Sequence, residues 1–212
     1  MMSTTTNGYF LKTMPPHSPD QYPNSKFEYF HDGSSVYSSR NSKLAEADLA
    51  SFFVYYSQLE TYGIARDKSH AYYYGAVISG ADPSTFTLAA PAYFARDKDH
   101  VFADGVILPG ADPKTFEPVD QITYRDSKST YCHEEYTHNL EGADPYQIRS
   151  YPRSSFATDG VHVYSIWACK ELQGADPYTF TPLSFDQTGA DNKHTYSIQK
   201  NGEEFTISVT SK

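Results

Sequence analysis

The sequence predicts a mainly all-β protein in which β-hairpin repeats of about 30 residues are stacked in one array, solenoid-like or propeller-like. Two recurring signatures and the residue composition lead to this prediction. The chain has 212 residues, and its 19 Tyr and 13 Phe suit strands that bury one face. Because a unit of this size cannot bury its apolar face alone, each unit is expected to pack on its neighbours.

The first signature is the heptapeptide Gly80-Ala81-Asp82-Pro83-Ser84-Thr85-Phe86, which returns at intervals of 30 to 32 residues. Its glycine can adopt a positive φ, its aspartate suits the N-cap of a helical turn, and its proline suits the first helical position. The alternative is a row of acidic ligands, but capping explains the aspartate, the glycine and the proline together. The signature therefore predicts structural corners, with caps at Asp48, in a degenerate copy, and at Asp82, Asp112, Asp144 and Asp176.

The second signature is an aspartate followed four and five residues later by a small or β-branched residue and then an aromatic residue. In the clearest copy, Asp97 opens a turn, residues 101–103 form a strand, Asp104-Gly105 is a tight turn, and residues 106–108 form the return strand. The signature marks six units, which start near residues 27, 62, 93, 122, 155 and 187. Their aspartates are Asp32, Asp67, Asp97, Asp126, Asp159 and Asp191.

The proline content separates the start of the chain from the repeats. Prolines at positions 15, 16, 19 and 23 oppose regular strand pairing, so residues 1–26 are expected to form an extended N-terminal arm. A short strand within residues 6–12 is compatible with this arm. Residues 27–212 are predicted to form a single repeat domain, and apolar spacing favours one short helix near residues 45–58.

With both signatures in view, the chain resembles the DKNYY family of bacterial repeat proteins. The family is named for an Asp-Lys-Asn-x-Val-Tyr-Tyr run that precedes Gly-Ala-Asp-Pro-x-Thr-Phe. Residues 67–74, Asp-Lys-Ser-His-Ala-Tyr-Tyr-Tyr, and residues 97–102, Asp-Lys-Asp-His-Val-Phe, carry this run best, and the resemblance extends over residues 27–200. Because the family is uncharacterised, the resemblance implies a repeat fold and no particular activity, cofactor or site.

The charge and the cysteines limit the partners and the compartment. A formal net charge of −9 without a basic block argues against binding to nucleic acid or an anionic membrane, and it suits a basic protein partner. Cys132 and Cys169 lie at non-equivalent positions of adjacent units and are predicted to be ordinary thiols in a reducing compartment. No signal peptide is visible in the chain as given, so a cytoplasmic location is expected.

Histidines follow four of the unit aspartates at the third position and could form a row of metal ligands with them. They are His70, His100, His162 and His194, whereas Ser35 and Ser129 stand in units one and four. A role in the turn, where histidine can bond the aspartate that opens it, explains the histidines better than an incomplete ligand row, so no metal site is predicted. His133 and His138 are five residues apart, which is the wrong spacing for a helical metalloprotease motif. No catalytic residue and no cofactor is predicted.

Units four and five are longer than units two and three at the hairpin tip, where binding specificity is usually placed. We expect a non-enzymatic protein-binding scaffold, for instance an immunity protein that neutralises a bacterial toxin. One alternative is a carbohydrate-active or other hydrolytic enzyme with an acidic cleft, for which Glu134, Glu135 and Glu141 are the candidate carboxylates. Another is a purely structural repeat protein in which Trp167 only fills a gap between units. The predicted interface residues are His133, Glu134, Glu135, Tyr136, Trp167 and Glu171.

Overall fold

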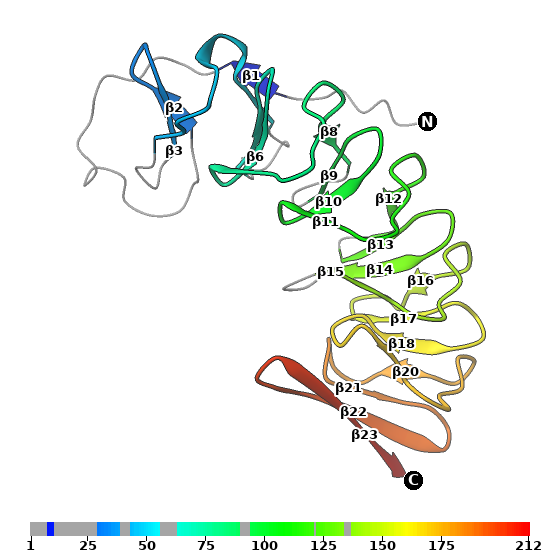
Figure 1. Ribbon diagram of the computed structural model, residues 1–212. Helices are drawn as coiled ribbons and strands as arrows, with labels where there is room; N and C mark the ends of the chain where they lie inside the picture. Colours follow the sequence, from blue (N-terminus) through cyan, green and yellow to red (C-terminus); the bar gives the residue numbers. More distant parts are fainter. Residues whose placement is uncertain are drawn as a thin grey trace. The chain divides into compact units, whose positions relative to one another are not determined.

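In the computed structural model, the residues described are 8–10, 29–38, 43–55, 63–89, 94–120, 122–133 and 137–212. The chain divides into two compact units, Met1–Pro113 and Lys114–Lys212. Strands predominate in both, and every pairing between named strands is antiparallel (Figure 1). The all-β fold of tandem hairpin repeats is therefore confirmed. The predicted domain 27–212 spans both compact units, and its folding as a single domain stays a prediction.

The described residues of the Met1–Pro113 unit form three sheets. The first has the strand order β1-β4-β5-β6-β7, the second pairs β2 with β3, and the third has the order β11-β10-β9-β8. The strands are β1 Gly8–Phe10, β2 Tyr29–His31, β3 Val36–Ser38, β4 Phe53–Tyr55, β5 Ile64–Arg66, β6 Ala71–Tyr73, β7 Ala76–Val77, β8 Thr87–Leu88, β9 Phe94–Arg96, β10 Val101–Ala103 and β11 Val106–Ile107.

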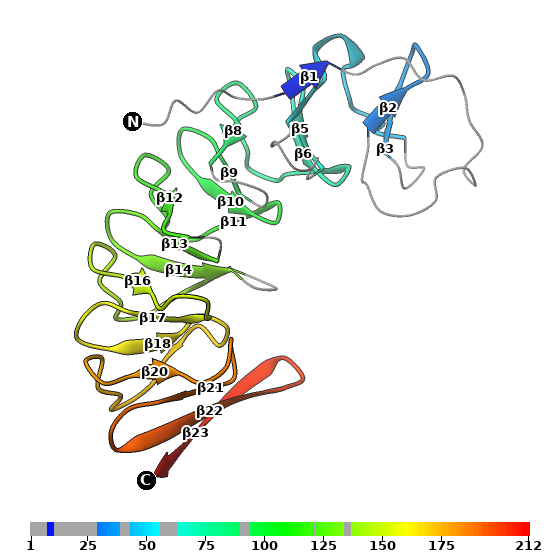
Figure 2. The same ribbon diagram turned by 180° about the vertical axis from the view of Figure 1, so that it is seen from behind.

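The Lys114–Lys212 unit contains three four-stranded sheets, whose strand order follows the chain: β12 to β15, β16 to β19, and β20 to β23. Figures 1 and 2 show these sheets following one another, with the long β22–β23 hairpin at the C-terminal end of the unit. The strands are β12 Glu117–Pro118, β13 Thr123–Arg125, β14 Thr130–His133, β15 Thr137–Asn139, β16 Arg149–Ser150, β17 Phe156–Thr158, β18 Val163–Ser165, β19 Lys170–Glu171, β20 Thr181–Pro182, β21 Thr188–Ala190, β22 His194–Asn201 and β23 Glu204–Ser211.

Each four-stranded sheet joins the short strand after one corner to the three strands of the next unit. Phe102 on β10 pairs with Ile107 on β11, and Asp104 and Gly105 between these strands have φ of 51° and 76°. This tight turn is the one that the Asp-Gly dipeptide predicts. The four-stranded sheets of units four to six are built in the same strand order. The extra residues of unit four fall between β14 and β15, at the hairpin tip.

The helix predicted near residues 45–58 is wrong. Asp48 caps a single 3-10 turn, Leu49–Ser51, and the chain then becomes extended as β4; residues 56–58 lie outside the described residues. β4 pairs with both β1 and β5, so its backbone groups are satisfied in a sheet. Phe52 at the end of the corner and Val54 on the strand are both buried. A corner followed by a strand therefore produces the apolar spacing that suggested a helix. Strand β1 lies within the short strand predicted at residues 6–12.

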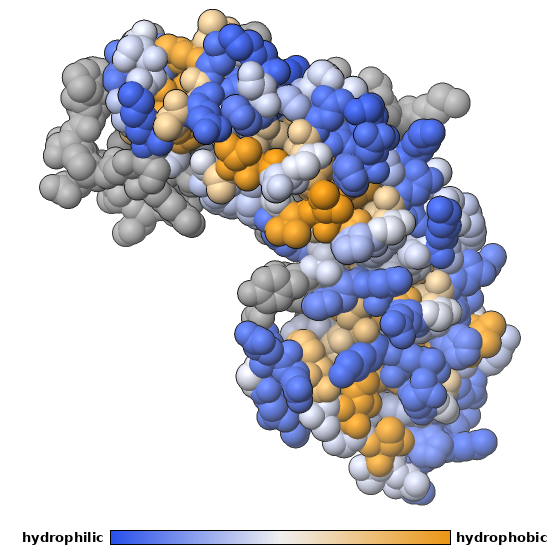
Figure 3. Space-filling view, viewed as in Figure 1, coloured by the Kyte–Doolittle hydropathy of each residue, from blue (hydrophilic) through white to orange (hydrophobic). Residues whose placement is uncertain are grey.

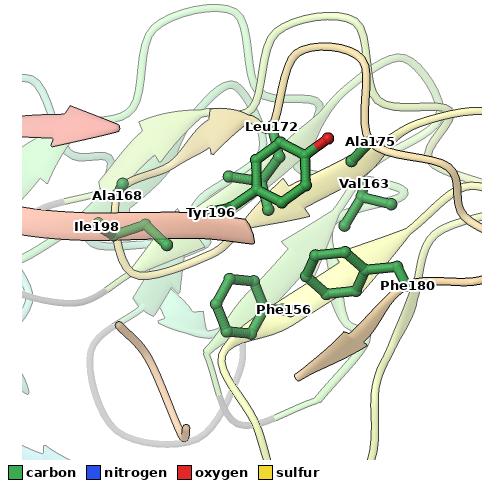
Figure 4. Close-up of a cluster of buried hydrophobic side chains, with 8 residues drawn as sticks. All are labelled: Phe156, Val163, Ala168, Leu172, Ala175, Phe180, Tyr196 and Ile198. Atoms are coloured by element: carbon green, nitrogen blue, oxygen red, sulfur yellow. The ribbon is translucent and has the colours of Figure 1, made fainter. Parts of the chain in front are cut away.

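Aromatic side chains fill the core between consecutive units. Figure 4 shows a cluster at the junction of units five and six, to which the corner residue Phe180 and the strand residue Tyr196 both belong. Its buried members are Phe156, Val163, Ala168, Leu172, Ala175, Phe180, Tyr196 and Ile198. Since this apolar surface comes from two units, neither can bury it alone. Among the described residues, no helix is long and apolar enough to cross a membrane.

Candidate functional site

The aspartate of the second signature is the centre of a buried hydrogen-bond network in units two to six. In unit five, Oδ1 of Asp159 accepts the backbone N–H of Val161 at 2.9 Å and that of His162 at 2.7 Å. Its Oδ2 accepts the hydroxyl of Tyr164 at 2.9 Å. The carboxylate thus closes its own turn and fixes the aromatic residue five positions later. The buried aspartates are Asp67, Asp97, Asp126, Asp159 and Asp191.

The same carboxylates hold the corners. Oδ2 of Asp97 accepts the backbone N–H of Asp82 at 2.8 Å, and Oδ2 of Asp191 accepts that of Asp176 at 3.0 Å. The bond from Asp144 to Asp159 is longer, at 3.4 Å. A corner aspartate and a turn aspartate are therefore joined within one structural element, which accounts for both signatures recurring together.

Hydrogen bonding determines the ionisation of these buried carboxyl groups. Burial raises the pKa of Asp159, but the backbone N–H groups of His162 and Val161 and the hydroxyl of Tyr164 lower it to about 2. The pKa values of Asp67, Asp97 and Asp191 are also lowered, against the effect of burial and chiefly by backbone N–H groups. These carboxylates are ionised at neutral pH and serve the fold as acceptors.

The turn histidines stay close to the aspartate of their own turn. Nδ1 of His162 lies 3.4 Å from Oδ2 of Asp159, and Nδ1 of His194 lies 3.7 Å from Oδ1 of Asp191. Each ring also meets the aromatic ring of its unit at an angle, as His162 does with Tyr164. In the part of the chain that the structure describes, no group of three or more His, Cys, Asp or Glu is placed to hold a metal ion.

The corner aspartates use their side chains as well as their backbone. Oδ1 of Asp82 accepts the backbone N–H of Ser84 at 3.0 Å, and Oδ1 of Asp48 accepts that of Ser51 at 3.1 Å. Asp144 and Asp176 accept in the same way from the residues two positions later. Asp112, in the second complete corner, lies before Pro113 at the end of the first compact unit. The contribution of these caps to stability stays a prediction.

The two cysteines form a disulfide between adjacent units, so the prediction of two unpaired thiols is wrong. Cys132 on β14 and Cys169 after β18 are 37 residues apart in sequence, and their Cα atoms are 5.7 Å apart. That separation lies within the range that a disulfide spans. Cys132 and Cys169 occupy non-equivalent positions in their repeat units. They meet because the turn at residues 166–169, in which Cys169 has a φ of 48°, brings the Cys169 sulfur to strand β14. The bond ties the tips of units four and five together.

A groove of about 1100 Å³ lies beside this disulfide in the Lys114–Lys212 unit. Unit four contributes His138 and Asn139 to its lining, and unit five contributes Trp167 and Glu171. The β22–β23 hairpin of unit six supplies the opposite side, including Phe205. The Trp167 and Phe205 rings meet edge to face, with centroids 4.9 Å apart. Residues from three hairpins thus line one concave surface.

The groove carries an excess of carboxylates. Its lysines, Lys170 and Lys200, are already engaged: Lys170 Nζ donates to the carbonyl oxygen of Phe205 at 3.1 Å, and Lys200 Nζ lies 5.6 Å from the Phe205 ring centre. Four glutamates line the same surface, and among the described residues none of them forms an ion pair: Glu141, Glu171, Glu203 and Glu204. The groove therefore favours a positively charged ligand.

Three of the predicted interface residues can be located. Trp167 and Glu171 line the groove, whereas His133 is only 6% exposed and is not part of the lining, with Nδ1 2.8 Å from Oγ1 of Thr137. Glu134, Glu135 and Tyr136 lie outside the described residues.

Sequence reasoning missed the unit-six side of the groove. Asn201-Gly202 indicates a hairpin, but only the structure shows that its eight-residue strands reach the tip of unit five. In Figure 3, the viewed face of the Lys114–Lys212 unit mixes hydrophilic and hydrophobic side chains and shows no single apolar patch covering it.

The fold and the groove define a tandem β-hairpin repeat protein whose last three units line one groove with aromatic and acidic side chains. A family model described as the DKNYY family matches residues 18–105, which confirms the resemblance over this part of the chain. The same signatures continue in units four to six, beyond the matched residues. No curated protein matches the chain, and no solved structure does.

Proposed function

We propose that this protein is a non-enzymatic binding scaffold whose groove takes a basic segment of another protein. The observation that carries the proposal is that the tips of units four and five, which are longer than those of units two and three, line one groove. The disulfide joins these tips before any partner arrives. A surface that is already ordered loses less conformational entropy on binding.

The chemistry of the groove favours arginine or lysine side chains. Trp167 offers an aromatic face and Glu171 a nearby carboxylate, while both lysines are directed at Phe205. A cation on an aromatic ring contributes about 0.5–2 kcal/mol, depending on how far it is desolvated. Complementary charge also speeds association and disfavours acidic competitors. An immunity protein that blocks a basic toxin is one instance of such a scaffold.

The compartment belongs to the same proposal. The Cys132–Cys169 disulfide favours an oxidising compartment, because cytosolic thiols are kept reduced. We therefore place the working form of the groove outside the cytosol.

The sole tryptophan provides the test. Peptides with two arginines in a Gly-Ser background are titrated while Trp167 fluorescence is recorded, with the same peptides carrying two glutamates for comparison. Saturable binding of the arginine peptides alone supports the proposal. Glu171→Gln combined with Glu203→Gln should weaken binding at least tenfold, whereas the control Asp186→Asn, which removes a carboxylate outside the groove lining, should not.

Two outcomes would overturn the proposal. One is equal binding of the arginine and glutamate peptides. The other is saturable binding of a chito-oligosaccharide with no response to either peptide, since Trp167, Asn139 and Glu171 also suit a sugar ring. That result would favour the carbohydrate-active alternative.

A further inference from the structure

Strand β23 has an open edge that lacks the usual protections. It is the outer strand of its sheet, and it pairs with β22 through all eight of its residues without a bulge. Apart from β22, the other described strands have two to four residues. From Phe205 to Ser211 it contains no proline and no charged residue. Edge strands are normally short, interrupted or charged, because an open edge invites another strand.

The backbone groups at this edge can be assigned from the hairpin register. Asn201 pairs with Glu204 across the two-residue turn, so these two residues exchange hydrogen bonds and the even-numbered residues of β23 bond to β22. The bond from Lys212 N–H to the carbonyl oxygen of Lys193, at 2.9 Å, continues this alternation. The N–H and C=O groups of Ile207 and Val209 consequently point away from the sheet.

The side chains on β23 alternate in the same regular way. Phe205 and Ile207 pack against the core cluster of units five and six, whereas Val209, next along that face, is 50% exposed. A strand added at this edge would place its own apolar side chains beside Val209. The edge thus offers both unpaired backbone groups and an uncovered apolar residue.

We propose that two copies of this chain associate by antiparallel pairing of their β23 edges, about a twofold axis at Ser208. In this register Ile207 of one copy lies opposite Val209 of the other, so the two residues exchange a pair of backbone hydrogen bonds. The twofold axis repeats this pair on the other side of Ser208. Phe205 lies opposite Ser211, where the Phe205 carbonyl oxygen also accepts from Lys170 Nζ within its own copy. The pairing extends the sheet across the two copies.

Charge selects this register over its neighbours. It places Glu204 of each copy opposite Lys212 of the other, and a shift by two residues in either direction removes both pairs. Lys212 Nζ donates to the carbonyl oxygen of Asp191, and its ammonium group has further donors for a carboxylate. Because a single strand pair is a small interface, the dimer is expected to form reversibly as the concentration rises.

Cysteine cross-linking tests the axis directly. The chain has no free cysteine among its described residues, and both of its cysteines are in the disulfide. In Ser208→Cys the two introduced thiols would face each other across the axis, at the Cα separation of about 4.5 Å that suits a disulfide. Mild oxidation should give a covalent dimer, whereas the control Thr206→Cys, which lies opposite Thr210, should cross-link at least tenfold more slowly.

Sedimentation of the unmodified chain provides the second measurement. Val209→Pro removes an outward N–H that β22 does not use, so it should abolish the dimer, whereas Val209→Thr keeps the N–H and should retain it. Glu204→Lys should weaken the dimer about tenfold, and adding Lys212→Glu should restore it. A monomer at every concentration, or equal cross-linking of the two cysteine variants, would overturn the proposal.

Discussion

The hydroxyl group of Tyr164 donates a hydrogen bond to the carboxylate oxygen of Asp159 that also accepts the backbone N–H of Asp144. Tyr72 and Tyr196 make the same bond to Asp67 and Asp191. In unit three the aromatic residue is Phe102, so the ring is kept and the hydroxyl is absent. The tyrosine therefore adds one charge-assisted hydrogen bond to a turn that can form without it.

Tyr164→Phe should lower the free energy of unfolding by about 1.5–3 kcal/mol, the range for a hydrogen bond to a charged group. Asp159→Ala should cost more, because it also leaves the backbone N–H groups of Val161 and His162 without their acceptor. Urea unfolding followed by Trp167 fluorescence reports on this part of the chain. A midpoint that Tyr164→Phe leaves unchanged would show that the bond contributes nothing.

The buried aspartates should give the fold an acid limit. The pKa of Asp159 is lowered to about 2, and those of Asp67, Asp97 and Asp191 are lowered as well, against the effect of burial. Unfolded aspartates titrate near 3.9, so the stability from these groups is complete above about pH 4 and is lost as the pH falls towards 2. Asp159→Asn removes one titrating group and should make the loss of stability with falling pH less steep.

At alkaline pH the dependence of stability on pH is reversed, and stability falls as the pH rises. Burial and the bond to Asp191 raise the pKa of Tyr196 to about 12. Its contribution is therefore complete below about pH 10 and is lost as the pH rises through the folded value. Unfolding midpoints measured from pH 2 to 12 should show a plateau between these limits. A maximum confined to a narrow range near pH 5 would contradict this assignment.

Gly189 on β21 should tolerate no side chain, because Phe180 occupies the space beside it. A Cβ atom there would lie 2.8 Å from Cε2 of Phe180 and would overlap its Cζ. Gly189→Ala should cost about 1–3 kcal/mol as an overpacked core. In a Phe180→Leu background the added methyl meets a smaller side chain, so the cost of Gly189→Ala should fall. Equal costs in the two backgrounds would exclude the Phe180 ring as the cause.

The sequence predicts local structure well where backbone chemistry is specific. Asp104-Gly105 indicates the turn that joins β10 to β11, because both residues suit positive φ. The spacing of the two signatures indicates the number of units. The short helix is the local failure: Phe52 and Val54 sit at positions that fit a helical face, but pairing of β4 on both edges stabilises the strand.

Contacts between units could not be predicted in the same way. Cys132 and Cys169 occupy different positions in their units, and the strand offset and turn direction that bring them together depend on how the repeats stack. The contribution of Phe205 to the groove also depends on stacking, since β22 and β23 extend beyond the length that the earlier units suggest. Repetition reveals which units are neighbours but not which of their non-repeated residues meet.

The disulfide should stabilise the Lys114–Lys212 unit and its groove together. It closes a loop with a sequence separation of 37 residues, for which loop-closure entropy gives about 4 kcal/mol. Cys132→Ala combined with Cys169→Ala should lower the urea midpoint, and dithiothreitol should lower that of the parent to a similar value. The double variant serves as the control, because the reductant should leave it unchanged. Two titratable thiols in parent protein from an oxidising compartment, or a midpoint insensitive to reduction, would contradict a stabilising bond between units four and five.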